Sequence, residues 1–136
     1  MDSITNKVWI GNYLDARDRP ALEKAGIRSI LCLDGSIAGI KPEELGVERA
    51  EVVELVDGSG NPPERFLRAV RLLRDLTAKH APVLVHCHAG QSRSAAVVCK
   101  YFMMEEGNSL AEAMRRIASR RRVAIMAGLQ EALDFK

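Results

Sequence analysis

Apolar and polar positions along the chain alternate between short apolar runs and longer stretches with helical spacing. Four short runs predict strands, at residues 8–10, 27–33, 51–56 and 83–86. The first ends at Gly11-Asn12 and is typical of an edge strand or a strand end. The fourth has three consecutive apolar residues before its histidine, which indicates a strand buried on both faces of a parallel sheet.

Helical spacing predicts five helices, which cover about residues 18–25, 61–77, 94–104, 109–118 and 128–135. In the second, Asn61 is the expected N-cap, with Pro62 at the first helical position and Glu64 completing a capping box. Strands that alternate with helices predict an α/β domain. We therefore expect a single domain over residues 1–136, with a central, mostly parallel, twisted sheet of about four to five strands flanked by helices.

Composition and charge narrow the class of protein. The 136 residues are 47% hydrophobic and 28% charged, which fits a soluble globular domain and excludes wholesale disorder. No apolar run approaches the roughly 18 residues of a membrane span, and no signal-peptide pattern is present. A net charge of +2 is too small to imply a nucleic acid partner. Three cysteines favour a reducing compartment, so we expect a cytoplasmic protein without membrane insertion. The sequence leaves the oligomeric state open, with a monomer as the expectation.

The residues that suggest a chemical function lie in the loop between the strand at residues 83–86 and the helix that starts near Arg93. Such a loop directs successive backbone N–H groups inward and ends at the positive end of a helix dipole, so it forms an anion cradle. Gly90 permits a backbone conformation that a Cβ would obstruct. The residues expected to bind a phosphate are His88, Ala89, Gly90, Gln91, Ser92 and Arg93.

Cys87 is the first residue of this loop and is the candidate nucleophile. A helix N-terminus and a nearby cation can lower a thiol pKa from about 8.5 to roughly 3.5–7.5, which yields a thiolate at neutral pH. The planar fork of Arg93 can bind two oxygens of a tetrahedral dianion. Ser94 can donate a hydrogen bond to the sulfur as a leaving group, and His86 is expected to orient the backbone near Cys87.

The segment His86-Cys87-His88-Ala89-Gly90-Gln91-Ser92-Arg93-Ser94 resembles the signature loop of the cysteine-dependent protein tyrosine phosphatases. Its Ser-Arg-Ser ending, followed by residues 100–104, most resembles the small, atypical dual-specificity branch. Residues 8–14, 22–27 and 109–113 are also similar to that branch. The resemblance implies a protein tyrosine phosphatase-like fold, a phosphorylated protein substrate, and a two-step mechanism that needs no metal and no cofactor.

In that mechanism an aspartic acid protonates the leaving oxygen and later activates water. The family places this acid on a mobile loop about thirty residues before the cysteine, just ahead of a helix. Asp57 lies 30 positions before Cys87, in a loop with two glycines. Glu54 is the alternative, although its place within a predicted strand argues for a fixed orientation.

Several residues near this segment have alternative interpretations. Cys32 and Cys99 are expected to be buried apolar residues. Some related phosphatases suggest a second role for Cys32, a reversible disulfide with Cys87. The triplet His86-Cys87-His88 could hold a metal, although no second ligand cluster exists and Arg93 would repel a cation. The arginine run at residues 120–122, near Arg115-Arg116, could recruit an acidic substrate or an anionic lipid, but it is expected to be a solvated helix end.

Three classes of function stay open. The first is hydrolysis of phosphotyrosine in proteins, with phosphoserine and phosphothreonine as further candidates. The second is hydrolysis of a phosphoinositide, a nucleotide or an RNA 5′ end. Lipid phosphatases of this superfamily often carry loop lysines, where this chain has His88 and Gln91. The third is a phospho-binding module without turnover, although such modules typically lack the cysteine or the arginine. A rhodanese-type sulfur transferase is disfavoured by Arg93.

The final segment departs most from the family pattern. The family often has an Arg-Pro pair and an aromatic-Gln-Leu helix. Here the chain runs from Arg122 to Gln130 without that proline or that aromatic residue. This difference concerns the packing of the last helix rather than the chemistry.

Overall fold

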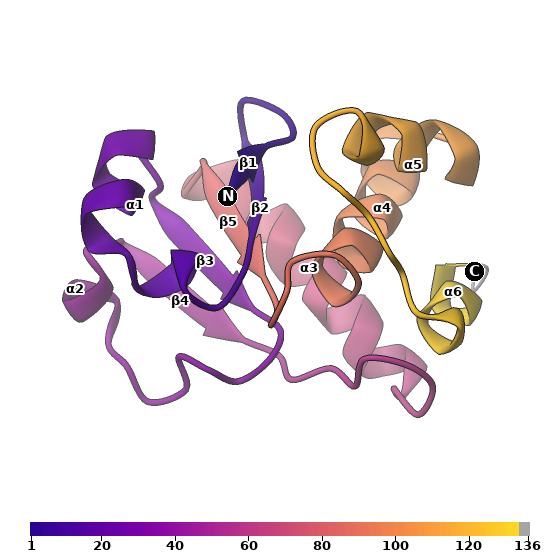
Figure 1. Ribbon diagram of the computed structural model, residues 1–136, viewed down its shortest axis with the longest axis horizontal. Coiled ribbons are helices and arrows are strands. Elements are labelled where there is room, and N and C mark those ends of the chain that lie inside the picture. The colour runs from indigo at the N-terminus through magenta and orange to yellow at the C-terminus, as the bar shows by residue number, and fades with distance from the viewer. Residues whose placement is uncertain (134–136) are drawn as a thin grey trace.

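The computed structural model describes residues 1–133 and contains a five-stranded sheet in the order β1-β2-β5-β3-β4 (Figure 1). The strands are β1 (Asp2–Ser3), β2 (Val8–Gly11), β3 (Ser29–Cys32), β4 (Arg49–Val52) and β5 (Val83–His86). Only β1 is antiparallel to its neighbour; β2, β5, β3 and β4 are all parallel. The predicted α/β class and mostly parallel sheet are confirmed.

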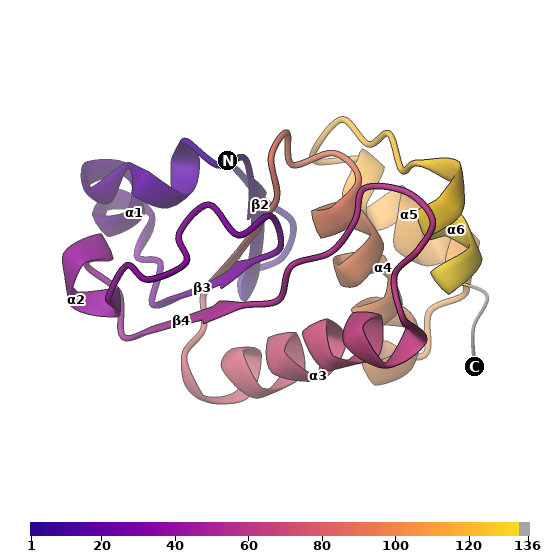
Figure 2. The same ribbon diagram turned by 90° about the horizontal axis from the view of Figure 1, so that it is seen from below.

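Helices cover both faces of this sheet (Figure 2). One side carries a 3-10 helix η1 (Asp15–Arg17), α1 (Arg19–Ala25) and α2 (Pro42–Leu45); the other carries α3 (Pro63–Lys79), α4 (Arg93–Glu106), α5 (Leu110–Ala118) and α6 (Ala127–Leu133). None of the helices within residues 1–133 is long and apolar enough to cross a membrane.

The sheet separates two hydrophobic layers because successive strand residues face opposite sides. In β3, Leu31 packs in the larger layer with α3 to α6, whereas Ile30 and Cys32 pack in the smaller layer with α1 and α2. All four residues of β5 are buried, as predicted. The carboxyl end of this fully enclosed strand leads directly into the loop that starts at Cys87.

Residue periodicity predicted the position of α3 well. It predicted the strands at the edges of the sheet less accurately. The predicted apolar stripe of α3 is buried, at Phe66, Ala69, Val70, Leu73, Leu76 and Thr77. Residues 8–10 do lie in a strand, but of the two alternatives, an edge strand or a strand end, the edge strand is wrong because β1 pairs with β2 on its outer side.

The strand predicted at residues 51–56 instead begins at Arg49 and ends at Val52. The backbone N–H groups of Val53 and Leu55 still donate to the carbonyls of Cys32 and Leu33, so the chain leaves the sheet gradually. The last predicted helix starts at Ala127 and is described to Leu133; its expected end at Phe135 lies outside the described residues.

Candidate active site

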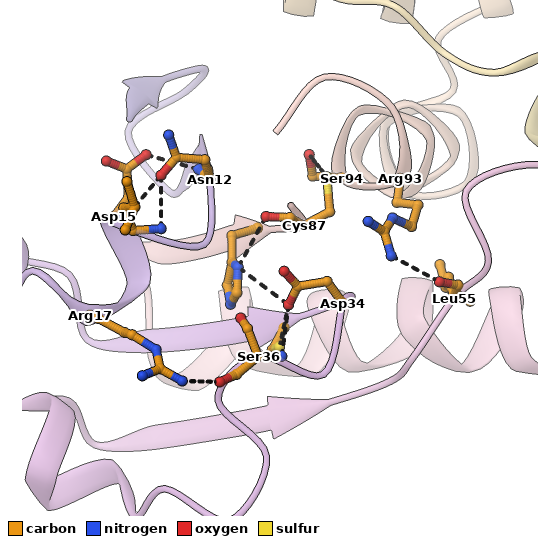
Figure 3. Close-up of polar contacts among 12 residues, drawn as sticks. Asn12, Asp15, Arg17, Asp34, Ser36, Leu55, Cys87, Arg93 and Ser94 are labelled. Carbon is orange, nitrogen blue, oxygen red and sulfur yellow. Dashed lines mark hydrogen bonds and ion pairs between the residues drawn. The ribbon is translucent and has the colours of Figure 1, made fainter. Parts of the chain in front are cut away.

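Cys87 lies where β5 ends, with only 2% of its surface exposed. Its Sγ is 3.3 Å from Oγ of Ser94, a buried residue in the first turn of α4 (Figure 3). The sequence places them together because a short loop joins a buried strand to a helix that begins at Arg93. The sulfur therefore lies near the positive end of the α4 dipole, where a negative charge is favoured.

A cavity of about 350 Å³ opens above the sulfur. It is lined by Asp57, Cys87, His88, Ala89, Gln91, Ser92, Arg93, Ala124 and Met126. The structure thus brings together the predicted nucleophile, the predicted acid and most of the predicted phosphate-binding loop. Gly90 and Ser94 support the loop from outside this lining. Glu54 is absent from the lining, and its side chain lies over Gly35.

The backbone of the loop provides the donors that an anion needs. The amides of residues 88–92 donate no hydrogen bond to any acceptor in the described part of the chain. Gly90 has φ of +70°, and a Cβ there would lie 2.4 Å from the carbonyl oxygen of Gly11. This close contact is the physical reason for glycine at that position.

Arg93 presents its guanidinium to the cavity from the start of α4. Its Nη1 donates to the carbonyl oxygen of Leu55 over 3.1 Å, which fixes the orientation of the fork (Figure 3). Its Nε is buried and has no partner within residues 1–133. A bound oxyanion would supply acceptors for this donor set.

His86 is fully buried beneath the loop, and its Nδ1 lies 3.4 Å from the carbonyl oxygen of Cys87 and 3.9 Å from Oδ1 of Asp34. This position agrees with the expected orienting role. Burial lowers the pKa of His86, and the charge of Asp34 opposes that effect in part. For Asp34, burial alone would raise the pKa, but hydrogen bonds from Ser36 and Cys32 lower it overall.

Asp57 is exposed on a loop that Asn61 closes. The Asn61 side chain accepts a hydrogen bond from the Val56 N–H at 2.6 Å and donates to the Val56 carbonyl at 2.8 Å. The prediction that Asn61 caps the helix is therefore wrong: Pro62 precedes the first helical residue, Pro63, and no side-chain cap is formed. The amide of Asn61 is used to satisfy the loop backbone instead.

His88 stacks against Tyr13 at one edge of the cavity, with ring centroids 4.6 Å apart and planes 5° from parallel. The Tyr13 N–H also donates to the His88 carbonyl. This stack gives the exposed His88 a defined orientation, pointing toward Tyr13 rather than toward a metal shared with His86.

A different group of possible metal ligands lies below the loop. Ligand atoms of Cys32, Asp34 and His86 all lie within 4.8 Å of one another. Cys32 Sγ lies 3.3 Å from Oδ1 of Asp34, which also accepts from the Ser36 N–H, so this carboxylate is satisfied by the protein itself. Cys32 and Cys87 pack in opposite layers of the core, and all three cysteines are free thiols.

Sequence reasoning missed four contributors to this site: the Leu55 carbonyl, Asp34, Tyr13 and Arg121. Their signals were weak or absent. Every residue has a backbone carbonyl, so the role of the Leu55 carbonyl cannot be inferred from the residue type. Asp34-Gly35 has the ordinary pattern of a turn. Arg121 stands within a run of arginines that suggested a solvated helix end, yet only 14% of its side chain is exposed.

The family model described as "Dual specificity phosphatase, catalytic domain" matches residues 8–133. The chain belongs to the dual specificity phosphatase family. This membership places it in the cysteine-dependent protein tyrosine phosphatase superfamily, as the signature loop suggested.

Relatives of this dual specificity phosphatase domain include Dual specificity protein phosphatase 1 of Arabidopsis thaliana, 28% identical over 89% of this chain. The human serine/threonine/tyrosine-interacting protein is 32% identical over 89% of the chain. The chain spans 60% and 56% of the lengths of these two proteins.

Solved structures agree with the fold. The crystal structure of the human interacting protein, described as tyrosine phosphatase-like, has a TM-score of 0.80 and covers 98% of this chain and 92% of that one. A structure of PTPMT1 in complex with PI(5)P is 25% identical, with a TM-score of 0.75, and covers 96% of this chain and 89% of that one.

Proposed function

We propose that this protein hydrolyses phosphomonoesters in proteins, with phosphotyrosine as the first substrate and phosphoserine and phosphothreonine as further ones. One observation carries the proposal: Cys87 Sγ lies at the base of a cavity whose wall also holds Arg93, Asp57 and unpaired backbone amides. Each group needed for phosphoryl transfer to sulfur is present at one site. A reducing compartment such as the cytoplasm suits a nucleophile of this kind.

In the first step the thiolate of Cys87 attacks phosphorus, the sulfur–phosphorus bond forms and the ester oxygen–phosphorus bond breaks. Asp57 donates its proton to the departing oxygen, while Arg93 and the loop amides bind the equatorial oxygens. In the second step Asp57, now a carboxylate, takes a proton from water as it attacks the cysteinyl-phosphate. Ser94 donates a hydrogen bond to the departing sulfur, and inorganic phosphate leaves.

A phosphoinositide is the second candidate substrate, because a structural relative is described in complex with PI(5)P. The loop of this chain offers His88 and Gln91 at the interior positions rather than lysines. Neither adds a fixed positive charge of the kind that a second headgroup phosphate would require. This composition favours a substrate with a single phosphate.

Binding without turnover is the third candidate, since one relative is named an interacting protein rather than a phosphatase. That alternative is disfavoured here because the nucleophile, the arginine and the acid are all present around one cavity. A binding module would not need a hydrogen-bond donor beside the sulfur, such as Ser94 would provide for a leaving group.

A competition assay tests these alternatives. Phosphate release would be measured for a phosphotyrosyl peptide, the matching phosphothreonyl peptide and a short-chain phosphatidylinositol 5-phosphate, with Cys87→Ser as the blank. We expect the phosphotyrosyl peptide to have the highest kcat/KM, by about tenfold or more over the lipid. A preference for the lipid, or activity that survives Cys87→Ser, would overturn the proposal.

A further inference from the structure

A strap, residues 121–126, follows α5 and packs against the phosphate loop. Ala124 and Met126 of the strap line the cavity, whereas Arg121 does not. Arg121 extends from this strap and donates through Nε to the Gly90 carbonyl at 2.7 Å and through Nη2 to the Ala89 carbonyl at 3.2 Å. Its Nη1 lies 2.8 Å from Oδ2 of Asp2 in β1. One side chain therefore joins the N-terminal strand, the strap and two consecutive peptide groups of the loop.

The neighbouring carbonyls of the loop are also bound from outside. Backbone N–H groups of Tyr13 and Ala124 donate to the carbonyls of His88 and Gln91, at 3.2 and 2.9 Å. The Met126 N–H donates to Oγ of Ser92 at 3.0 Å. Four consecutive carbonyls, from His88 to Gln91, thus have donors on the outer side. Arg121 is the only side chain among these donors within the described residues.

This arrangement determines where the loop amides point. A peptide group is planar and trans, so its C=O and N–H point in opposite directions. Holding the carbonyls of Ala89 and Gly90 outward therefore turns the N–H groups of Gly90 and Gln91 inward. Those amides are the donors that an oxyanion above Cys87 would meet, and fixing them beforehand removes the cost of reorganising them on binding.

Close contacts hold the Arg121 guanidinium in this position. A Cβ on Gly90 would lie 2.6 Å from Nη2 of Arg121, so the guanidinium rests directly on this glycine. Its Nη1 is occupied by Asp2, and its three nitrogens are thus all engaged on the outer side of the loop. Unlike Arg93, it does not line the cavity.

We propose that Arg121 is a positioning residue that preorganises the phosphate loop for oxyanion binding, with Asp2 fixing its orientation. The inference rests on the proposed phosphatase function and identifies what keeps that site in its anion-binding form. It assigns to Arg121 no contact with substrate. Its effect is expected in the affinity for any tetrahedral oxyanion, whether or not turnover follows.

The test uses inorganic tungstate as the probe and Arg121→Met as the main variant, which keeps an unbranched apolar stem and removes the guanidinium donors. We expect the tungstate dissociation constant from calorimetry to rise about tenfold, because the loop amides must then be oriented on binding rather than beforehand. Arg121→Lys, which keeps one donor nitrogen, should restore part of this loss.

Arg120→Met is the matched control, because Arg120 is an exposed neighbour whose side chain makes no hydrogen bond within residues 1–133. It should bind tungstate as the parent does. A folded Arg121→Met protein with parental tungstate affinity would overturn the proposal. If Arg121→Met does not fold, Asp2→Ala, which removes the acceptor for Nη1, decides: weaker tungstate binding supports the inference, and unchanged binding refutes it.

Failure of the proposed function would give a different result. If the parent protein bound tungstate tightly and Arg121→Met bound it weakly, yet neither released phosphate from any substrate, the loop assignment would stand. Only the assignment of hydrolytic activity would then fall.

Discussion

Ser94 makes a contact that we expect to matter in only one half of the proposed reaction. Its Oγ lies 3.3 Å from the sulfur of Cys87, and both atoms are buried. We expect Ser94→Ala to leave the formation of the cysteinyl-phosphate nearly unchanged and to slow its hydrolysis about tenfold, because the departing thiolate loses a hydrogen bond. Rapid-quench kinetics with p-nitrophenyl phosphate should show a burst of one equivalent followed by a slow steady state.

Ser119→Ala, an exposed serine at the end of α5, is the control and should show no new burst. Equal slowing of the burst and of the steady state in Ser94→Ala would mean that Ser94 acts on the first step. The assignment to the leaving group would then be wrong.

Asp57 and Glu54 are two carboxylates of one segment with different surroundings. Only Asp57 lines the cavity, while Glu54 lies over Gly35. Asp57→Asn should lower kcat for a phosphotyrosyl peptide by roughly 100-fold, the usual loss for a general acid. The loss should be smaller for an aryl phosphate with an acidic leaving group, which needs less protonation. Glu54→Gln should retain parental rates. If Glu54→Gln lost activity and Asp57→Asn did not, Glu54 would be the general acid instead of Asp57.

The residues that sequence reasoning found and missed differ in how their roles are encoded. Cys87, Arg93 and Ser94 are close in sequence, so a strand followed by a helix is enough to bring them together. Arg121 reaches the same loop from 31 residues beyond Gly90. Nothing in a run of arginines distinguishes the one that is held between carbonyls and a carboxylate. Only the tertiary structure separates it from its solvated neighbours.

At the scale of whole elements, α6 supports the loop that carries Asp57. A Cβ on Gly128 would lie 2.0 Å from the backbone nitrogen of Ser59, so helix and loop are in direct contact. A glycine-to-alanine change inside a helix ordinarily stabilises it. Here we expect Gly128→Ala to displace the loop and to lower kcat for phosphotyrosyl peptides about tenfold, because a misplaced acid transfers its proton poorly.

Tungstate affinity distinguishes a misplaced acid from a disrupted phosphate loop, because the loop at residues 57–60 is not part of the phosphate loop that carries Cys87 and Arg93. The tungstate affinity of Gly128→Ala should therefore equal that of the parent protein. Ala127→Ser, an exposed neighbour at the start of α6, should leave both measurements unchanged. A parental kcat in Gly128→Ala would show that the contact does not position the acid.

Elements with strong periodicity could be predicted from sequence, and short elements could not. The stripe of α3 and the apolar run of β5 came directly from residue spacing, and the helix predicted at residues 109–118 begins at a capping box formed by Ser109 and Glu112. The helices η1 and α2 have three and four residues, too few for a helical period to appear. Strand β1 has two residues, and its pairing depends on β2 folding back beside it.

At the scale of the whole molecule, the strap at residues 121–126 forms part of the cavity wall, although its sequence departs from the family pattern. The strap binds the phosphate loop through the backbone N–H groups of Ala124 and Met126 as well as through Arg121. Hydrogen bonds from the backbone do not depend on which side chains the strap carries. The strap therefore contacts the loop without the family's proline and aromatic residue, and Leu129 and Leu133 of α6 are buried.

The overall stability should depend on pH through His86, which is fully buried under the loop beside Asp34. Burial lowers its pKa in the folded state, whereas in the unfolded chain the pKa is near 6.5. As the pH falls below about 6.5, the unfolded chain therefore binds a proton that the folded protein does not yet accept, and stability decreases. Glu48 does not contribute in this range, because Arg28 and His80 lower its pKa to about 2 and it stays ionised in both states.

We expect the midpoint of urea unfolding to fall between about pH 7.5 and about pH 5.5, and to fall less in His86→Asn, which has no group that titrates there. The informative quantity is the difference in unfolding free energy between parent and variant at each pH, because titrations elsewhere in the chain cancel in it. That difference should shrink on acidification. If it stayed constant, the folded protein would be binding a proton at His86 as readily as the unfolded chain does, and a neutral imidazole could not be what orients the Cys87 backbone.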